Sequence, residues 1–264
     1  MDPILQIKDL QTHFFTKAGV LKAVDGVSLE IGAGEIVGLV GESGSGKSIT
    51  GFSIMGLVDA PGRIVGGQIL FKGQDLAKLS PAEMQAYRGN RIAMIFQDPM
   101  MTLNPVLRIE TQMVETILSH DGSVSKIDAR ARARDALGLV GISSPDERLR
   151  AYPHQFSGGM RQRVSIAIAM LNRPDLIIAD EPTTALDVTI QGQVIHEMQR
   201  LCQETKTALL WITHDLAVVA GIAERICVMY AGRVVEQGPN ANVIAAPMHP
   251  YTTGLLGSVP GQNR

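Results

Sequence analysis

The chain has 264 residues, of which 45% are hydrophobic and 19% are charged, and its formal net charge is −2. This length and composition allow one sizeable domain, or a core with an inserted lobe, and the net charge excludes the overall basic field that nucleic-acid-binding domains use. Two cysteines without metal-ligand spacing, no secretory signal and no apolar run of about eighteen residues predict a soluble chain of a reducing compartment, which reaches a membrane only through partners.

The first predicted elements are short strands and turns over residues 3–34. Leu5 and Ile7 alternate with polar neighbours, and residues 27–31 alternate in the same way. Phe14 lies between these two runs. Its aromatic ring could stack on the base of a nucleotide or fill the core, and composition leaves both interpretations open.

A glycine-rich loop follows the next predicted strand. Residues 36–40 form a short apolar run typical of a buried parallel strand, and residues 48–57 predict a helix. The segment Gly41-Glu42-Ser43-Gly44-Ser45-Gly46-Lys47-Ser48 between them fits G-x-x-x-x-G-K-[ST] at every fixed position. The loop therefore predicts a nucleoside triphosphate site, without indicating which kind of NTPase carries it.

The chemistry of that loop follows from its residues. Glycines let backbone N–H groups close around the β-phosphate, and the helix N-terminus adds partial positive charge. We expect Lys47 to reach the β- and γ-phosphates and the Ser48 hydroxyl to ligate Mg²⁺. The predicted phosphate-binding set is Gly41, Ser43, Gly44, Ser45, Gly46, Lys47, Ser48 and Ile49.

Residues 80–90 predict a helix that Ser80 caps, with Pro81 at its first position and Glu83 in its first turn. Residues 92–96 then predict a buried strand that runs directly into Gln97. Ligands of open parallel sheets bind at strand ends, so Gln97 is a candidate site residue.

Residues 106–155 lack strand patterns and are rich in helix-forming residues, which predicts an inserted helical lobe. Arg130, Arg132 and Arg134 within it alternate with alanine. Such a run could indicate nucleic acid, but we predict the solvated face of a helix.

Ser157 is a good N-cap for the next predicted helix. Gly158 and Gly159 follow it, and each lowers helix propensity by about 1 kcal/mol, which suits a backbone that an anion must approach closely. The apolar strand of residues 176–180 then ends in two carboxylates. A surface turn is one interpretation; we predict that Asp180 holds Mg²⁺ through water and that Glu181 polarises the attacking water.

The last predicted strand of the core, residues 208–212, leads to His214, which is well placed to contact a γ-phosphate. Residues 226–238 predict a hairpin that turns at Ala231-Gly232. The tail, residues 239–264, is rich in proline and glycine.

Taken together, these motifs closely resemble the ATPase subunit of ABC transporters over nearly the whole chain. The motifs that carry the resemblance are, in order, the phosphate loop, Gln97, Ser157-Gly158-Gly159, Asp180-Glu181, Asp187 and His214. The family signature is usually Leu-Ser-Gly-Gly-Gln, whereas Phe156 and Met160 stand at its outer positions here, a change that leaves the Ser and Gly backbone contacts intact.

The resemblance implies an α/β fold: a P-loop NTPase core with a mostly parallel sheet, an N-terminal antiparallel β subdomain and an inserted α-helical subdomain. The implied core with its β subdomain covers residues 1–105 and 156–240. The helical subdomain would be residues 106–155, and the C-terminal tail residues 241–264.

The resemblance also implies a head-to-tail dimer in which each ATP lies between the phosphate loop of one subunit and Ser157-Gly158-Gly159 of the other. By position, Phe14 corresponds to the aromatic residue that stacks on adenine, and Asp187 to the residue that communicates across the dimer. The implied cofactors are ATP and Mg²⁺. The implied catalytic residues are Glu181, His214, Lys47 and Gln97, and the implied metal ligands are Ser48, Gln97 and Asp180.

A narrower resemblance, to the dipeptide/oligopeptide and nickel importer branch, rests on Ile95-Phe96-Gln97-Asp98-Pro99, on residues 152–160 and on the tail motif His249-Pro250-Tyr251-Thr252. It implies an ATPase at the cytoplasmic face of the membrane that drives peptide uptake through two permease subunits, supplied by an extracytoplasmic solute-binding protein. Nickel or another small solute is the alternative cargo. We expect a homologous second cassette, so that the complex holds a heterodimer.

Many relatives of this branch continue into a cysteine-rich segment with an iron–sulfur cluster, whereas this sequence ends at Arg264 without those cysteines. Either this member lacks the segment or the native chain continues beyond Arg264, and we predict no cluster in residues 1–264. Two other functions are weighed against the transport motor. A soluble ABC protein acting on ribosomes or DNA usually has two cassettes or a coiled-coil insertion. A small-molecule phosphotransferase would need an acceptor pocket and has no use for a second-subunit signature.

Overall fold

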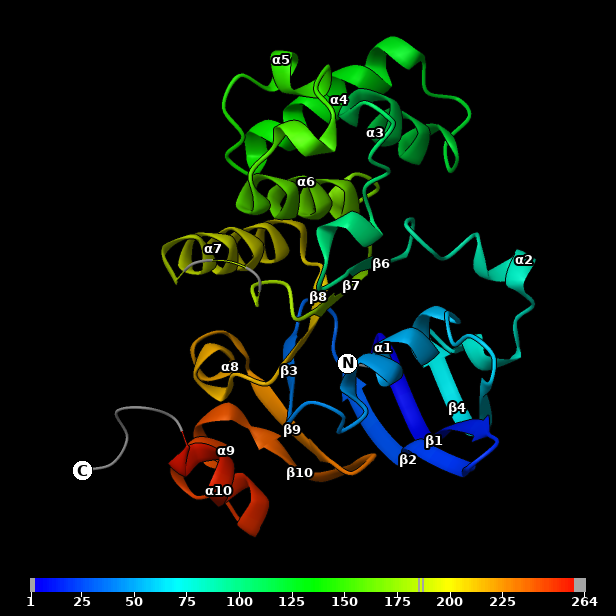
Figure 1. Ribbon diagram of the computed structural model, residues 1–264, viewed down its shortest axis with the longest axis vertical. Helices are drawn as coiled ribbons and strands as arrows, with labels where there is room; N and C mark the ends of the chain where they lie inside the picture. The colour runs from blue at the N-terminus through cyan, green and yellow to red at the C-terminus, as the bar shows by residue number, and fades with distance from the viewer. Residues whose placement is uncertain (1–2, 185, 187, 259–264) are drawn as a thin grey trace. The chain divides into compact units, whose positions relative to one another are not determined.

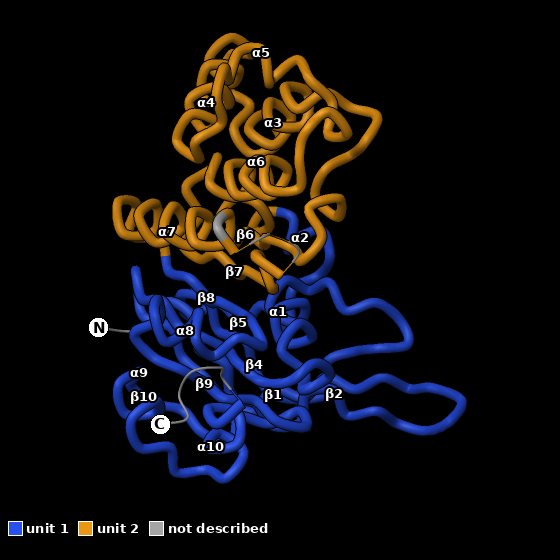
Figure 2. Tube along the Cα trace, turned by 60° about the vertical axis from the view of Figure 1, so that its left-hand side comes forward, with its two compact units in different colours: residues 1–85, 208–264 blue, residues 86–207 orange. Residues whose placement is uncertain are grey.

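The computed structural model describes residues 3–184, 186 and 188–258. The chain forms two compact units: residues 1–85 with 208–264, and residues 86–207 (Figure 2). The chain thus leaves the first unit once, builds the second, and returns. The helical stretch of residues 106–155 lies within the second unit.

The first unit opens with an antiparallel sheet in the strand order β2-β1-β4-β5. Leu5 of β1 stands opposite Ile31 of β2 and Phe71 of β4, and all three side chains are buried. Because alternate residues of a strand face the same side, the pattern at Leu5 and Ile7 produces one apolar face, as predicted. The bounds are β1 Leu5–Thr16, β2 Gly19–Ile31, β4 Gly62–Phe71 and β5 Gln74–Asp75.

The first unit also contains the strands that carry the phosphate loop, in the order β10-β9-β3-β8. Strand β3 (Ile36–Val40) is parallel to both β8 (Ala208–Thr213) and β9 (Arg225–Tyr230), and every residue of β3 and β8 is buried. Strand β10 (Arg233–Pro239) is antiparallel to β9, which confirms the predicted hairpin with its turn at Ala231-Gly232. The helical segments of this unit are α1 Lys47–Met55, η1 Leu76–Lys78, α2 Pro81–Met84, α8 Leu216–Ile222, α9 Asn240–Ala245 and α10 Pro250–Gly257.

The second unit pairs two buried parallel strands, β6 (Ile92–Ile95) and β7 (Leu176–Asp180). The helices α3, α4, α5 and α6 gather in one bundle (Figure 1), with the apolar faces of α3 and α4 buried. The helical segments are η2 Pro99–Met101, α3 Ile109–Leu118, α4 Lys126–Leu139, α5 Pro145–Leu149, η3 Pro153–Gln155, α6 Gly158–Met170 and α7 Val188–Thr205.

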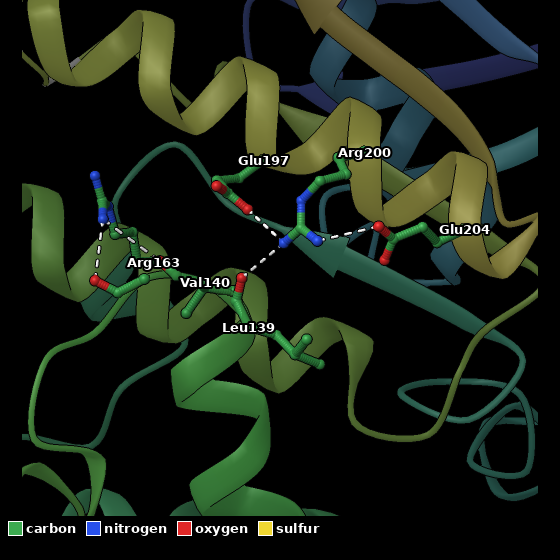
Figure 3. Close-up of polar contacts among 7 residues, drawn as sticks. Leu139, Val140, Arg163, Glu197, Arg200 and Glu204 are labelled. Atoms are coloured by element: carbon green, nitrogen blue, oxygen red, sulfur yellow. Dashed lines mark hydrogen bonds and ion pairs between the residues drawn. The ribbon is translucent and has the colours of Figure 1, made fainter.

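Two arginines hold the C-terminal end of α4 (Figure 3). Arg200 of α7 donates to the carbonyl oxygen of Leu139 at 3.1 Å and pairs with Glu197 and Glu204. Arg163 of α6 donates to the carbonyl oxygen of Gly141 at 3.3 Å. The last carbonyls of a helix lack partners within it and carry partial negative charge, so Arg200 satisfies the end of α4, while Arg163 binds the turn that directly follows it.

One predicted helix is shorter than expected. The capped start at Ser80 is confirmed: Ser80 and Glu83 exchange the two hydrogen bonds of a capping box. The helix nevertheless ends at Met84 rather than near residue 90. Gly89 has φ +71°, which is left-handed, and Arg88 bridges to Ile92, so the chain has already turned toward β6.

The arginine run of α4 is a solvated helix face, as predicted. Arg132 and Arg134 are exposed, and Arg130 pairs with Glu110 and Asp146. Among the described residues, none of the helices has the length and apolar character needed to cross a membrane.

Candidate functional site

The phosphate loop connects β3 to α1 in the first unit, as the motif requires. Gly41 and Gly46 are sterically fixed: a Cβ on Gly41 would lie 2.1 Å from the carbonyl oxygen of Met229, and one on Gly46 would lie 2.2 Å from that of Ala23. Gly46 also has φ +106°. Only glycine fits both positions, so the loop backbone can lie directly on the neighbouring strands.

Lys47 begins α1 and is buried, with 4% of its surface exposed. Its ammonium group donates to the carbonyl oxygens of Gly41 at 2.7 Å and Glu42 at 2.8 Å. The first turn of α1 contains no acidic side chain, so its positive end is available to an anion. The buried hydroxyl of Ser45 finds no hydrogen-bond partner in the described part of the chain, as expected of a group that a ligand completes.

In the second unit, the polar residues that follow β6 and β7 meet. Gln97 follows β6, and its side-chain amide donates to Glu181 Oε2 at 3.3 Å. The hydroxyl of Thr184 donates to the same oxygen at 2.9 Å. Glu181 has the uncommon φ of +45°, and the preceding Asp180 is 5% exposed at the end of β7. Gln97 and Glu181, each predicted separately as a site residue, thus lie within hydrogen-bond distance of each other; Thr184 is not among the predicted site residues, although it follows the carboxylate by three positions.

The start of α6 presents a second capped helix end. Ser157 accepts a hydrogen bond from the N–H of Met160 at 3.3 Å, and Ser157 and Gly158 are exposed. A Cβ on Gly158 would meet nothing within 4 Å, whereas one on Gly159 would lie 2.8 Å from Ile190 of α7. The close packing of α6 on α7 thus explains Gly159, and Gly158 remains the glycine that suits an approaching ligand.

The remaining predicted residues lie on separate elements. His214 is exposed directly after β8, where Asp215 caps α8. Phe14 is half-buried, and its ring packs over Gly62 of β4, where a Cβ would lie 2.6 Å from the ring. Asp187 lies outside the described residues. Within those residues, no three His, Cys, Asp or Glu side chains gather into a metal site.

The sequence matches two family models. Residues 24–184 match the model described as ABC transporter, which covers more than half of the chain. The chain belongs to the ABC transporter family. Residues 235–264 match the model described as Oligopeptide/dipeptide transporter, C-terminal region. The ABC ATPase predicted from the motif order is therefore confirmed, including the peptide-importer branch.

Curated relatives agree over nearly the full length of this ABC ATPase. It is 50% identical to the dipeptide transport ATP-binding protein DppD of Bacillus subtilis (strain 168) over 261 residues, which cover 98% of this chain and 78% of the relative. It is 51% identical to DppD of Escherichia coli (strain K12) over 257 residues, 97% of this chain and 78% of the relative.

A solved ABC cassette has the same fold. The dimeric, post-hydrolysis structure of MJ0796 bound to ADP and Pi gives a TM-score of 0.80 at 27% identity, covering 89% of this chain and 98% of that one. The predicted α/β P-loop fold with its antiparallel β subdomain is confirmed. This ABC ATPase binds ATP, and its hydrolysis is coupled to transport.

Proposed function

We propose that this chain hydrolyses ATP at a head-to-tail dimer interface to drive uptake of di- or oligopeptides through partner permeases. The observation that carries the proposal is the start of α6. It is an exposed, serine-capped helix end with an open Gly158, whose donors can bind the phosphates of a nucleotide held by another subunit. The dimeric neighbour bound to ADP and Pi and the peptide-transport relatives support it.

In this proposal, the phosphate loop holds the triphosphate through the N–H groups of residues 44–49, and the ring of Phe14 stacks on the adenine. Ser157, Gly158 and Gly159 bind the γ-phosphate of the nucleotide on the partner subunit. Asp187, outside the described residues, is assigned to communication across the dimer. The cofactor pair is ATP with Mg²⁺.

The candidate metal ligands fit Mg²⁺ by their chemistry. Ser48 offers a hydroxyl, Gln97 an amide oxygen and Asp180 a buried carboxylate, and Mg²⁺ prefers such oxygen donors, completed by phosphate oxygens and water. When bound, the ion would neutralise charge on the β- and γ-phosphates. We assign Ser48 as a direct ligand and Asp180 as one that acts through water.

Glu181 is assigned as the general base. Gln97 and Thr184 donate to its Oε2, which fixes the carboxylate at the end of β7. It would accept a proton from water as the water oxygen attacks the γ-phosphorus and the bond to the β–γ bridging oxygen breaks, releasing ADP. Lys47 and His214 would stabilise the charge that develops on the phosphoryl oxygens.

The partners follow from the same proposal. We infer a second, homologous ATPase cassette, two membrane permeases and, indirectly, an extracytoplasmic solute-binding protein, with this subunit at the cytoplasmic face of the membrane. Nickel or another small solute is the alternative cargo, because the sequence motifs resemble a branch that includes nickel importers as well as peptide importers. Co-purification with two polytopic membrane proteins would separate this motor from a soluble ABC protein and from a phosphotransferase.

The experiment that tests the mechanism is Glu181→Gln in the full chain. The amide keeps the shape of the side chain but does not take a proton, so kcat for ATP should fall at least about a hundredfold, in the range of general-base effects. ATP binding should persist, and a dimer should accumulate with ATP and Mg²⁺ in size-exclusion chromatography. Glu115→Gln, on the exposed face of α3, is the matched control. Turnover near the wild-type rate in Glu181→Gln would reject the assigned role.

A further inference from the structure

The phosphate loop is supported from behind by the last third of the chain. The N–H of Gly232, in the β9–β10 turn, donates to the carbonyl oxygen of Ser45 at 2.9 Å. The carbonyl oxygen of Met229 lies beside Gly41, where a Cβ would clash at 2.1 Å. The loop backbone is thus fixed at its first glycine and at its middle by one hairpin.

The tail makes a further contact with the same loop. The N–H of Glu42 donates to the hydroxyl oxygen of Tyr251 at 2.9 Å, across 209 residues of sequence. The carbonyl oxygen of Glu42 accepts from the ammonium of Lys47 at 2.8 Å. Glu42 therefore connects the tail to Lys47: its N–H contacts Tyr251, and its carbonyl oxygen contacts the lysine ammonium.

Tyr251 is held at the loop by hydrogen bonds between β10 and residues 248–251, which we call the tail anchor. The carboxylate of Glu236 in β10, 7% exposed, accepts the N–H groups of Met248 at 2.8 Å and His249 at 3.0 Å. His249 Nδ1 then caps α10 by accepting the N–H of Tyr251 at 3.1 Å. Pro250 occupies the first position of α10, where a missing N–H costs nothing, and Thr252 is fully buried.

The ring and the hydroxyl of Tyr251 have separable contacts. The ring packs against that of Tyr230, at the end of β9, with centroids 4.5 Å apart and planes tilted by 43°. A phenylalanine would keep this ring contact and the burial of the tail. The hydroxyl contributes the contact with Glu42, so a tail that served only to cover the core would not need it.

We propose that the C-terminal tail is part of the ATP site, and that Tyr251 is a positioning residue that orients the phosphate loop, and with it Lys47, through Glu42. The inference rests on the proposed ATPase function. A loop already held in place has less conformational freedom to lose when the triphosphate binds. Coupling of this kind is reciprocal, so ATP should strengthen docking of the tail by the same factor.

The test compares Tyr251→Phe with Tyr230→Phe, which removes the other hydroxyl of the ring pair, both in the full chain. Tyr251→Phe should raise the Kd for the fluorescent analogue mant-ATP about fivefold, because fivefold corresponds to about 1 kcal/mol, the net value of a typical hydrogen bond. KM for ATP should rise with Kd, kcat should change less than KM, and the Tm should stay near that of wild type. Tyr230→Phe should leave Kd unchanged.

Hydrogen exchange gives a second readout. Without nucleotide, amides of residues 41–48 should exchange faster in Tyr251→Phe than in wild type. A non-hydrolysable ATP analogue with Mg²⁺ should slow exchange in residues 248–257 of wild type, and this protection should be lost in Tyr251→Phe.

If wild type binds mant-ATP and Tyr251→Phe shows the same Kd and the same hydrogen exchange as wild type, the role of Tyr251 is overturned. Equal effects of the two substitutions would also overturn it, since the ring pair rather than the hydroxyl would then be responsible. A wild-type chain that fails to bind mant-ATP would instead overturn the ATPase assignment.

Discussion

At the scale of single residues, we expect both cysteine thiols to be unreactive in the folded protein. Cys202 in α7 and Cys227 in β9 are 2% and 0% exposed. Burial raises the pKa of both thiols to about 12. The thiolate is the reactive form of cysteine, so neither side chain has the protonation state or the access that modification requires.

We therefore expect native protein at pH 8 to show essentially no reaction with Ellman's reagent over an hour, and both thiols to react rapidly after unfolding in urea. Absorbance at the released thionitrobenzoate band measures this. A native thiol that reacts within minutes would contradict the burial of Cys202 or Cys227.

Residues of the candidate site differ in how far the sequence predicts them. The phosphate loop is contiguous, and Gln97 and Glu181 both follow apolar strands, so pattern alone predicts them as candidate residues, whereas their contact with each other is seen only in the structure. The contact of Tyr251 with Glu42 joins residues 209 apart and depends on the path of the tail. The left-handed backbone of Glu181 is likewise set by its surroundings, because no glycine signals it.

At the scale of elements, the sequence predicts where strands lie better than where helices end. Apolar runs predict β3, β6, β7 and β8 because parallel strands are buried on both faces. The cap at Ser80 predicts the start of α2, but its end at Met84 goes with a local turn, in which Gly89 is left-handed and Arg88 bridges to Ile92. Gly159 is glycine because α7 packs on it, which no local pattern indicates.

In the tail anchor, the carboxylate of Glu236 accepts the N–H groups of Met248 and His249, so we expect the free energy of unfolding to depend on pH. Burial alone raises the pKa of Glu236, but the N–H groups of Met248 and His249, which donate to its carboxylate, outweigh the burial, so the pKa lies below its ordinary value. A lowered folded-state pKa stabilises above the unfolded-state pKa, about 4.3, and this stabilisation is lost as the pH falls through the folded-state pKa.

Glu236→Gln should therefore lower the free energy of unfolding by about 2 kcal/mol at pH 7, the scale of hydrogen bonds to a charged group. The difference from wild type should shrink as the pH falls from 5 toward 3. Urea midpoints at several pH values, followed by the fluorescence of buried Trp211, measure this. Exposed Glu115→Gln is the control, and a difference that stays constant with pH would contradict the role of the carboxylate.

At the scale of the whole molecule, the order of the motifs was enough to predict the family and the fold class. That order encodes a topology, since each motif marks a strand or helix end of the same core. The division into residues 1–85 with 208–264 and residues 86–207 is different in kind. It depends on which segments pack against one another in three dimensions, and hydrophobic periodicity along the chain does not show this. The domain boundaries proposed from the resemblance remain a prediction.

A transport motor also needs a surface for its permeases, and we expect the segment after Gln97 to provide it. Met101 and Val106 are 70% and 75% exposed. Exposed apolar side chains close together in a segment mark candidate interaction sites. Because this segment begins at a residue assigned to the ATP site, contact with a permease here would connect transport to hydrolysis.

Met101→Glu and Val106→Glu should each weaken association with the two permeases at least about tenfold, because burial of one such side chain contributes about 1.5–3 kcal/mol and a buried unpaired carboxylate adds a cost. Co-purification from membranes and uptake of a labelled dipeptide into proteoliposomes measure the effect. Ile127→Glu, at an 82% exposed position of α4, is the matched control and should assemble normally. Full assembly and uptake in both Met101→Glu and Val106→Glu would place the permease contact elsewhere on the subunit. Loss of assembly in all three variants would indicate a general effect of added charge rather than a contact at this surface.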